Sequence, residues 1–304
     1  MNGSQLNKND VTYILNFLKS KINEIENEKT ILHIFNSKYI LDNTILNNLP
    51  IGLFGNFYSQ ELSFFLINNN DYKNLDNFFV KCNLKIKKII SKSFVEGSII
   101  VNDNLDCETF AKVKLGQDFS KILFFENAAL KYVENFEFGT NIIINDISKI
   151  IGLDKMAVMN ILTSSDFCNQ KKKDDILDQK FFKSKNFRKI KKKLVFEIAS
   201  ARIEEMVEII FSKNVNFSNF INKTKIPVFI NINEKFNVSC FEEDFISKFS
   251  KTSGSTVKVI KNNDSEKFCE SALKIVQYGW KKEAVPILQE KKSIIGRIFH
   301  KIFS

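Results

Sequence analysis

The chain is short of arginine. Only Arg188, Arg202 and Arg297 are arginines among its 45 basic residues, and arginine is the preferred residue for bidentate contacts with phosphate and guanine. The net charge of +10 is therefore weak support for a nucleic-acid interface. The basic runs at 171–173 and 188–193 fit solvated faces. We expect no nucleic-acid partner, with a basic nucleic-acid-binding module as one alternative.

The chain also lacks paired cysteine motifs and long apolar runs. Its five cysteines include no C-x-x-C spacing, which is typical of reduced thiols. No window approaches the roughly 18 apolar residues of a membrane-spanning helix, and the N-terminus has no signal-peptide pattern. These absences predict a folded cytoplasmic protein. With 44% hydrophobic residues over 304 positions, the chain can bury sizeable cores in about one to three domains.

Apolar spacing predicts a small α+β unit in the first 92 residues. The expected elements are a helix near 10–27, strands at 30–35 and 62–67, a helix at 75–82 and an alternating strand at 84–90. His33 lies within the first of these strands, and no carboxylate or cysteine stands at a recognisable spacing from it or from His300. The histidines therefore support neither a catalytic triad nor a metal site.

A second, larger block follows from about residue 93. It begins with three successive strands, and helices then alternate with strands. The strands are expected at 109–115, 121–126, 130–136, 228–232 and 256–260, and the helices at 142–151, 156–162, 194–211, 241–249 and 272–279. This order is similar to one half of an actin-like ATPase, which has an α/β fold.

Four segments resemble a known family in the same order along the chain. They are Leu75 to Ile90, Gly139 to Ile147 (similar to G-G-N-x-x-T-x-D-I), Glu197 to Glu205 (similar to E-x-I-x-x-R-x-x-E) and Ala272 to Gly279 (a helix ending in Y-G). Together they resemble FtsA, the bacterial actin-like cell-division protein, over roughly residues 5–304. The resemblance implies an inserted α+β subdomain at 1–92, an actin-like (ribonuclease H-like) domain at 93–280, a linker at 281–292 and an amphipathic helix at 293–304.

Departures from the family concern its nucleotide-binding loops. The resemblance implies ATP and magnesium as cofactors, with Gly116, Asp146, Arg202 and Glu205 at positions that line the nucleotide cleft. However, the family's D-x-G-G-G-T hairpin corresponds to residues 114–121, which keep only one glycine, and its adenosine loop corresponds to residues 230–237, which have none. The part of the family that carries the first phosphate hairpin has no counterpart in this sequence. We therefore expect no ATP hydrolysis, and ATP with magnesium rests on the resemblance alone.

The last residues predict a basic amphipathic helix. At about 100° per residue from Ser293, one half of the helix is apolar and the other polar. The apolar half contains Ile294, Ile295, Ile298, Phe299, Ile302 and Phe303, and the polar half contains Gly296, Arg297, His300, Lys301 and Ser304. With Lys291 and Lys292 before it, this segment is typical of a helix on an anionic membrane surface. Packing on the protein's own body, or in a partner's groove, are the alternatives.

These features predict a cell-division scaffold that tethers FtsZ filaments to the membrane. The resemblance implies FtsZ, other division proteins and self-association as partners, with peripheral localisation on the cytoplasmic face of the bacterial inner membrane at the division site. Self-association would present many weakly binding tails together. An ATP-binding actin-like protein of the FtsA or pilus-assembly type is the alternative.

Overall fold

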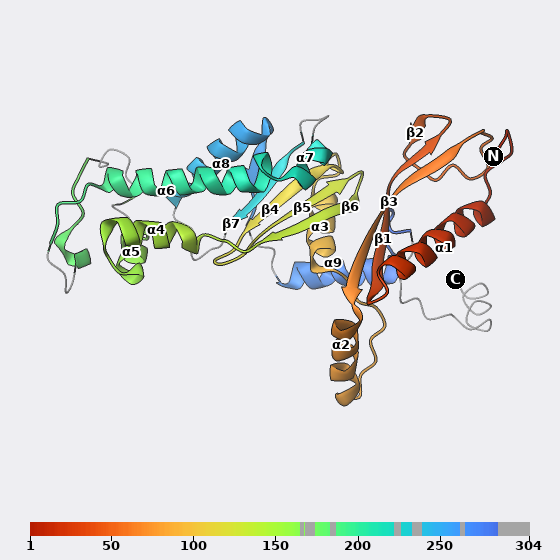
Figure 1. Ribbon diagram of the computed structural model, residues 1–304, viewed down its shortest axis with the longest axis horizontal. Coiled ribbons are helices and arrows are strands. Elements are labelled where there is room, and N and C mark those ends of the chain that lie inside the picture. The colour runs from red at the N-terminus through yellow and green to blue at the C-terminus, as the bar shows by residue number, and fades with distance from the viewer. Residues whose placement is uncertain are drawn as a thin grey trace. The chain divides into compact units, whose positions relative to one another are not determined.

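The chain divides into two compact units. The computed structural model describes residues 1–164, 167, 174–182, 187–221, 226–232, 239–261 and 265–284 (Figure 1). The first unit comprises 1–108, 125–131 and the chain from 263 onward, and the second comprises 109–124 and 132–262. This division differs from the predicted ranges 1–92 and 93–280, which stay predictions about family subdomains. The predicted tail helix, most of the linker and the 171–173 lysine run lie outside the described residues.

The first unit is built on a three-stranded antiparallel sheet in the order β2-β1-β3. Its elements are α1 (Lys8–Ile25), β1 (Lys29–Leu41), β2 (Thr44–Leu46), β3 (Tyr58–Asn68), α2 (Asn69–Lys81), α3 (Lys92–Asp103) and α9 (Ser265–Tyr278). The helix α1 begins after Asn7, whose side chain caps it while the Asp10 carboxylate accepts from the Asn7 amide. The two predicted helices and two of the three predicted strands are confirmed.

Residues 280–284, at the end of the described chain, are hydrogen-bonded to β1. The Asn36 amide donates to the Lys282 carbonyl at 2.9 Å, and the Ala284 amide donates to the Ile34 carbonyl at 2.7 Å. The Trp280 indole donates to the Ala128 carbonyl at 2.7 Å. The main chain just before residue 285 is therefore held by hydrogen bonds within the first unit.

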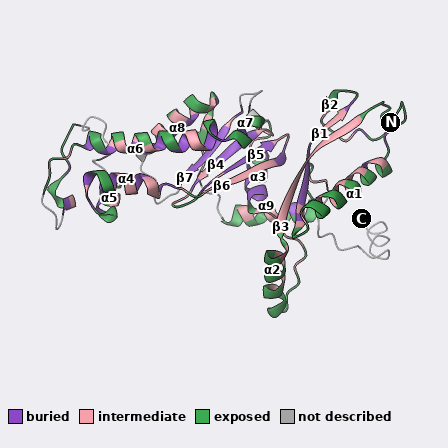
Figure 2. Ribbon diagram, in the orientation of Figure 1, coloured by how far each residue is buried: buried purple, intermediate pink, exposed green. Residues whose placement is uncertain are grey.

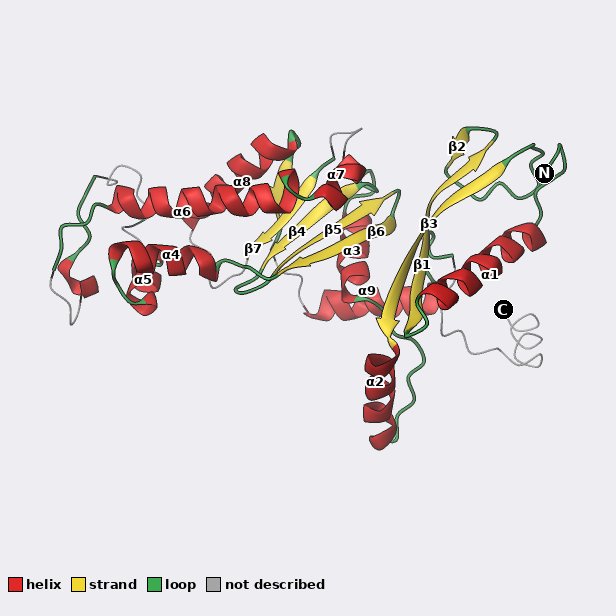
Figure 3. Ribbon diagram, in the orientation of Figure 1, coloured by secondary structure: helices red, strands yellow, loops and turns green. Residues whose placement is uncertain are grey.

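The predicted strand from Leu84 to Ile90 is wrong. This segment leaves α2 as a loop (Figure 3), and Leu84 is 57% exposed. Alternating apolar residues indicate an extended conformation with two faces, but a strand also needs a neighbour. Within the described sheet, β1 is paired with β3 along one side and with β2 on the other. The alternating pattern therefore indicates an extended conformation, but it cannot show whether a neighbouring strand is there to pair with.

Helix α3 was missed for a related reason. Every residue from Ser93 to Val101 is buried, including Glu96, Gly97 and Ser98. A helix that is buried all round has no polar face, so its sequence shows little 3.6-residue periodicity. Gly97 permits this packing because a Cβ there would lie 2.0 Å from the Phe125 ring.

The second unit contains most of a five-stranded sheet in the order β6-β5-β4-β7-β8. The strands are β4 (Phe110–Leu115), β5 (Ser120–Glu126), β6 (Ala129–Phe136), β7 (Val228–Ile232) and β8 (Val257–Val259), and the last two pair in parallel with β4 and β7. The strands β4 and β7 are almost wholly buried (Figure 2), as expected of the parallel part of a sheet. The predicted order, three successive strands and then helices alternating with strands, is confirmed.

Helices complete the second unit. They are α4 (Asn141–Ile151), α5 (Lys155–Leu162), the short helix η2 (Gln179–Phe182), α6 (Lys192–Val207), which continues as the π-helical turn η3 (Glu208–Ser212), α7 (Val215–Ile221) and α8 (Ser239–Ser253). Apolar residues from α4, α6 and α8 meet those of β4, β5 and β7 in one continuous core. This core fixes the ends of β4 and β6, where the candidate site lies.

Candidate functional site

The turn between β4 and β5 is bonded directly to the start of α4. The Gly116 amide donates to the Phe119 carbonyl at 3.0 Å, which closes the turn. The amides of Thr140 and Asn141 donate to the carbonyls of Gly116 and Gln117, each at 2.9 Å. The Thr140 hydroxyl also donates to the Gly116 carbonyl at 3.2 Å. Two stretches that are more than twenty residues apart are thus joined mainly by main-chain hydrogen bonds.

Gly139 makes this close approach possible. A Cβ at this position would lie 2.4 Å from the Gln117 carbonyl oxygen and 2.5 Å from that of Gly116. Such contacts are with main chain, which cannot move aside as a flexible side chain can. Glycine is therefore required here by space.

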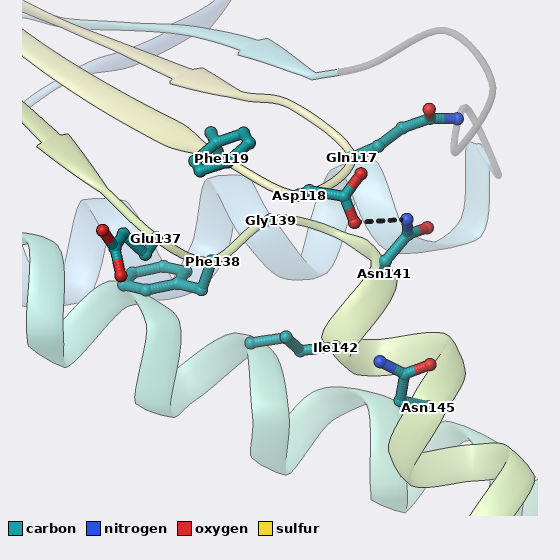
Figure 4. Close-up of a pocket in the computed structure, with 9 residues that line it drawn as sticks. All are labelled: Gln117, Asp118, Phe119, Glu137, Phe138, Gly139, Asn141, Ile142 and Asn145. Atoms are coloured by element: carbon teal, nitrogen blue, oxygen red, sulfur yellow. Dashed lines mark hydrogen bonds between the residues drawn. The ribbon is translucent and has the colours of Figure 1, made fainter.

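An open pocket of about 490 Å³ lies at this junction (Figure 4). The residues that line it are Gln117, Asp118, Phe119, Glu137, Phe138, Gly139, Asn141, Ile142 and Asn145. The Asp118 carboxylate accepts from the Asn141 side-chain amide at 2.8 Å. Phe119 is 67% exposed. Its ring is therefore not packed in the core, as it would be if it served stability alone. None of these nine residues carries a positive charge.

The described main-chain amides around this junction are largely bonded within the chain. Phosphates bind where main-chain amides are free and point at them. Here the amides of Gly116 and of residues 140–143 all donate to main-chain carbonyls. The turn also carries the Asp118 carboxylate, which accepts from the Asn141 side chain. One predicted site residue, Gly116, closes the turn through its amide.

The other three predicted site residues are brought together by α4 and α6. The Arg202 guanidinium pairs with the carboxylates of Asp146 and Glu205. The side chains are partly exposed, at 31% for Arg202 and 23% for Asp146. This arrangement neutralises the arginine with carboxylates of its own chain, and so it joins α4 to α6 as an ion-pair cluster.

A buried polar cluster in the first unit was not predicted. The His33 Nδ1–H donates to a Glu283 oxygen at 2.7 Å, because the His33 Nε2 accepts from the Ser91 amide at 3.0 Å. The other Glu283 oxygen accepts from Lys88 at 3.3 Å. The partners stand 250 positions apart, so no sequence spacing could have shown the pair.

The environment of Glu283 favours its charged form. Burial alone would raise the pKa of this carboxyl, but the hydrogen bond from His33 and the charge of Lys88 outweigh burial and lower the pKa. The side chains of His33 and Glu283 are 0% and 1% exposed, which gives no route for a substrate. The cluster is therefore structural.

Within the described residues, no group of three or more histidine, cysteine or acidic side chains could hold a metal ion. Among the same residues, no helix combines the length and apolar character needed to cross a bilayer. Residues 233–237, the larger part of the stretch 230–237 predicted as the adenosine-loop counterpart, lie outside the described residues.

Comparison with known proteins gave structural matches alone. No protein-family model and no curated protein matched the chain. The PilM–PilN type IV pilus biogenesis complex is 9% identical, with 91% of this chain and 74% of that chain covered and a TM-score of 0.46. MreB5 of Spiroplasma citri bound to AMPPNP is 13% identical, with 69% and 65% covered and a TM-score of 0.40. The archaeal actin homologue Ta0583 is 10% identical, with 61% and 55% covered and a TM-score of 0.39.

The chain spans less than two-thirds of the length of MreB5 and of Ta0583. All three TM-scores are below 0.5. The class of fold therefore depends on the observed sheet order, which defines the second unit as α/β with three successive strands followed by parallel crossovers.

Proposed function

We propose that this protein is a non-hydrolysing actin-like scaffold that tethers protein filaments to a membrane through its C-terminal segment. The single observation that carries the proposal is the segregation of residues 293–304 into an Ile/Phe half and a polar half that contains Arg297 and Lys301. The order of elements in the second unit supports the actin-like class. The resemblance to FtsA supplies the expected filament, FtsZ, and the expected place, the cytoplasmic face of the inner membrane at the division site.

The charge and the apolar face of the tail act together at an anionic surface. Lys291, Lys292, Arg297 and Lys301 are each worth about 1 kcal/mol there, and the apolar half inserts at the headgroup boundary. Such a tail binds weakly and reversibly as a single copy. A scaffold that self-associates would present several tails at once and gain avidity.

The junction of Gly116 and Asn141 supports a role without nucleotide chemistry. Its described amides at Gly116 and 140–143 are bonded to carbonyls, and the negatively charged Asp118 would repel a phosphate. Calorimetric titration of the full chain with ATP and magnesium tests this part. We expect no heat of binding, and micromolar affinity would favour an ATP-binding protein of the FtsA or pilus-assembly type.

Liposome co-sedimentation tests the tether. We expect the full chain to pellet with vesicles that contain anionic lipid, and both a Lys291–Ser304 deletion and an Ile298→Asp, Phe299→Asp double variant to stay in the supernatant. A His300→Asp, Ser304→Asp double variant is the matched control, because it adds the same charge to the polar half. The proposal fails if all four proteins pellet equally, or if the control loses as much binding as the apolar-face variant.

Recruitment of filaments is a separate step. Polymerised FtsZ should pellet with anionic vesicles only when the full chain is present, and not with the deletion variant. If the chain binds vesicles but recruits no filament, the membrane part of the proposal stands and the partner is wrong.

A further inference from the structure

The strand β3 forms an edge of the sheet in the first unit. The sheet order is β2-β1-β3, so β3 pairs with β1 along one side and, within the described chain, with no strand along the other. Among the same residues, no main-chain hydrogen bond joins its eleven residues to a loop or a helix. Alternate residues of an edge strand direct their amides and carbonyls away from the paired neighbour. A row of main-chain donors and acceptors therefore remains open along β3.

Apolar side chains lie on both faces of this open edge. Every residue from Tyr58 to Ile67 is half-buried, with no alternation between a buried and a solvent-facing side (Figure 2). Phe65 packs edge-on against the buried Phe35, with ring centroids 5.7 Å apart. The opposite face of β3 carries the apolar residues Leu62, Phe64 and Leu66. A strand added at this edge would extend the apolar layers on both faces of the sheet.

Features that usually prevent edge pairing are scarce on β3. Edge strands are commonly protected by lysine, by proline or by a bulge in the edge strand itself. β3 contains no lysine or proline, and its one charged residue is Glu61. The Glu61 carboxylate already pairs with Lys38 at 3.2 Å and with Lys131 at 2.5 Å. The extra residues of the two bulges, Leu32 and Ser37, belong to β1. The edge of β3 is therefore regular and carries little charge.

Two copies of β3 match each other in an antiparallel register centred on Phe64. In that register, residues equally far on either side of Phe64 face each other across the two strands. The facing pairs are Leu62 with Leu66, Ser63 with Phe65, Glu61 with Ile67 and Gln60 with Asn68. No charge faces a like charge, and polar residues meet at the two ends. The centre also falls within residues 62–65, which pair with β1 without interruption.

We propose that β3 pairs with β3 of a second copy of this chain about a two-fold axis at Phe64. The contact is isologous, so both copies satisfy their open edges at once and the dimer closes. An unrelated segment would need its own nearly uncharged, apolar sequence, which β3 of a second copy already has. The dimer goes beyond the proposed tether and uses no tail residue, but it would present two tails to one membrane.

Sedimentation velocity of the full chain without lipid tests the dimer. Between about 1 and about 100 µM we expect a reversible shift from monomer to dimer. The Lys291–Ser304 deletion should dimerise equally. A monomer throughout, open-ended oligomers, or a dimer that is lost with the tail would each overturn the proposal. Since no lipid is present, failure here is distinguishable from failure of the tether.

Hydrogen exchange locates the contact in the unaltered chain. The amides of β3 should become more protected as the protein concentration rises, because the outward ones gain partners. Those of β8, an edge strand of the other sheet, are the control and should exchange at the same rate throughout. If a dimer forms while β3 exchanges at a constant rate, another surface makes the contact and the proposal is overturned.

Paired substitutions test the register among variants whose circular dichroism matches the wild type. Leu62→Lys, Leu66→Lys places lysines opposite each other, whereas Leu62→Glu, Leu66→Lys brings opposite charges together and makes the monomer equally polar. The second variant should dimerise on the order of tenfold more tightly than the first. Leu273→Lys, Val276→Lys, at exposed positions on α9, is the control and should dimerise as the wild type does. Equal association of the two β3 variants, including none in either, overturns the register, and loss of the dimer in the α9 variant overturns β3 as the contact.

Discussion

The first unit of this protein contains a buried polar cluster beside its apolar contacts, and it can be compared with the continuous core of the second unit. In the second unit, apolar side chains of three helices and the sheet form one continuous core. In the first, His33 stacks on Phe35 with ring centroids 5.4 Å apart, while it bonds Glu283 and the Ser91 amide. Apolar contacts are not directional, whereas a buried polar group needs each of its partners. Substitutions in the apolar core should therefore act through volume, and those in the polar cluster of the first unit through partners and pH.

The largest effect should come from emptying the core of the second unit. Phe245 is fully buried, so Phe245→Ala should lower the free energy of unfolding by about 3–5 kcal/mol through lost transfer energy and a cavity. Chemical denaturation followed by circular dichroism measures the change. Phe119→Ala is the matched control at an exposed ring, and it should cost less than about 0.5 kcal/mol. Equal losses would show that this core does not carry the unit.

A smaller loss is expected when the polar cluster of the first unit is cut. Glu283→Gln keeps the shape but leaves Lys88 buried without its charged partner, which should cost about 1–3 kcal/mol. A Glu283→Gln, Lys88→Met double variant should recover part of this loss, because the unpaired charge is gone. Glu24→Gln, in the exposed Lys21–Glu24 pair, is the control and should change stability by less than about 0.5 kcal/mol. Additive losses would mean that Lys88 and Glu283 do not act as a pair.

The same carboxyl should give the first unit a pH dependence. Its pKa is lowered in the folded protein by His33 and Lys88, against the opposing effect of burial. This contribution is therefore complete above the unfolded pKa of about 4.3 and is lost as the pH falls through the lower folded value. Unfolding measured from pH 6 down to about pH 3 should show a steeper loss in the wild type than in Glu283→Gln. Parallel profiles would exclude Glu283 as the source.

The sequence predicted the features that depend on local contacts, and it did not predict those that depend on long-range contacts. Helices such as α1 and α4 and the strands of the second sheet were predicted because their apolar residues repeat with a regular period. The segment 84–90 shows the same regularity without a neighbouring strand, and α3 is buried on every side and shows little. The spacing of apolar residues therefore predicts the local conformation of a segment, but not which elements pack against that segment.

The candidate site was predicted in part for the same reason. Gly116 and the trio of Asp146, Arg202 and Glu205 were named by position in a motif, and the trio does come together. The motif could not show that the Thr140 and Asn141 amides are bonded to the carbonyls of Gly116 and Gln117, because those bonds join residues far apart in the sequence. His33 and Glu283 are a more extreme case of the same limit.

The smallest predicted effect concerns the ion-pair cluster of Arg202, which belongs to neither kind of stabilisation. Its side chains are partly exposed, so water screens the pairs, and Arg202→Gln should lower the free energy of unfolding by about 0.3–1 kcal/mol. An Arg202→Gln, Asp146→Asn double variant should cost little more, because the two residues share one interaction. Denaturation curves measure both changes, with Lys21→Gln as a control at another exposed pair. A loss of several kcal/mol would place the cluster with the buried contacts, while a change in the heat of ATP titration would show that these residues act on a ligand as well as on α4 and α6.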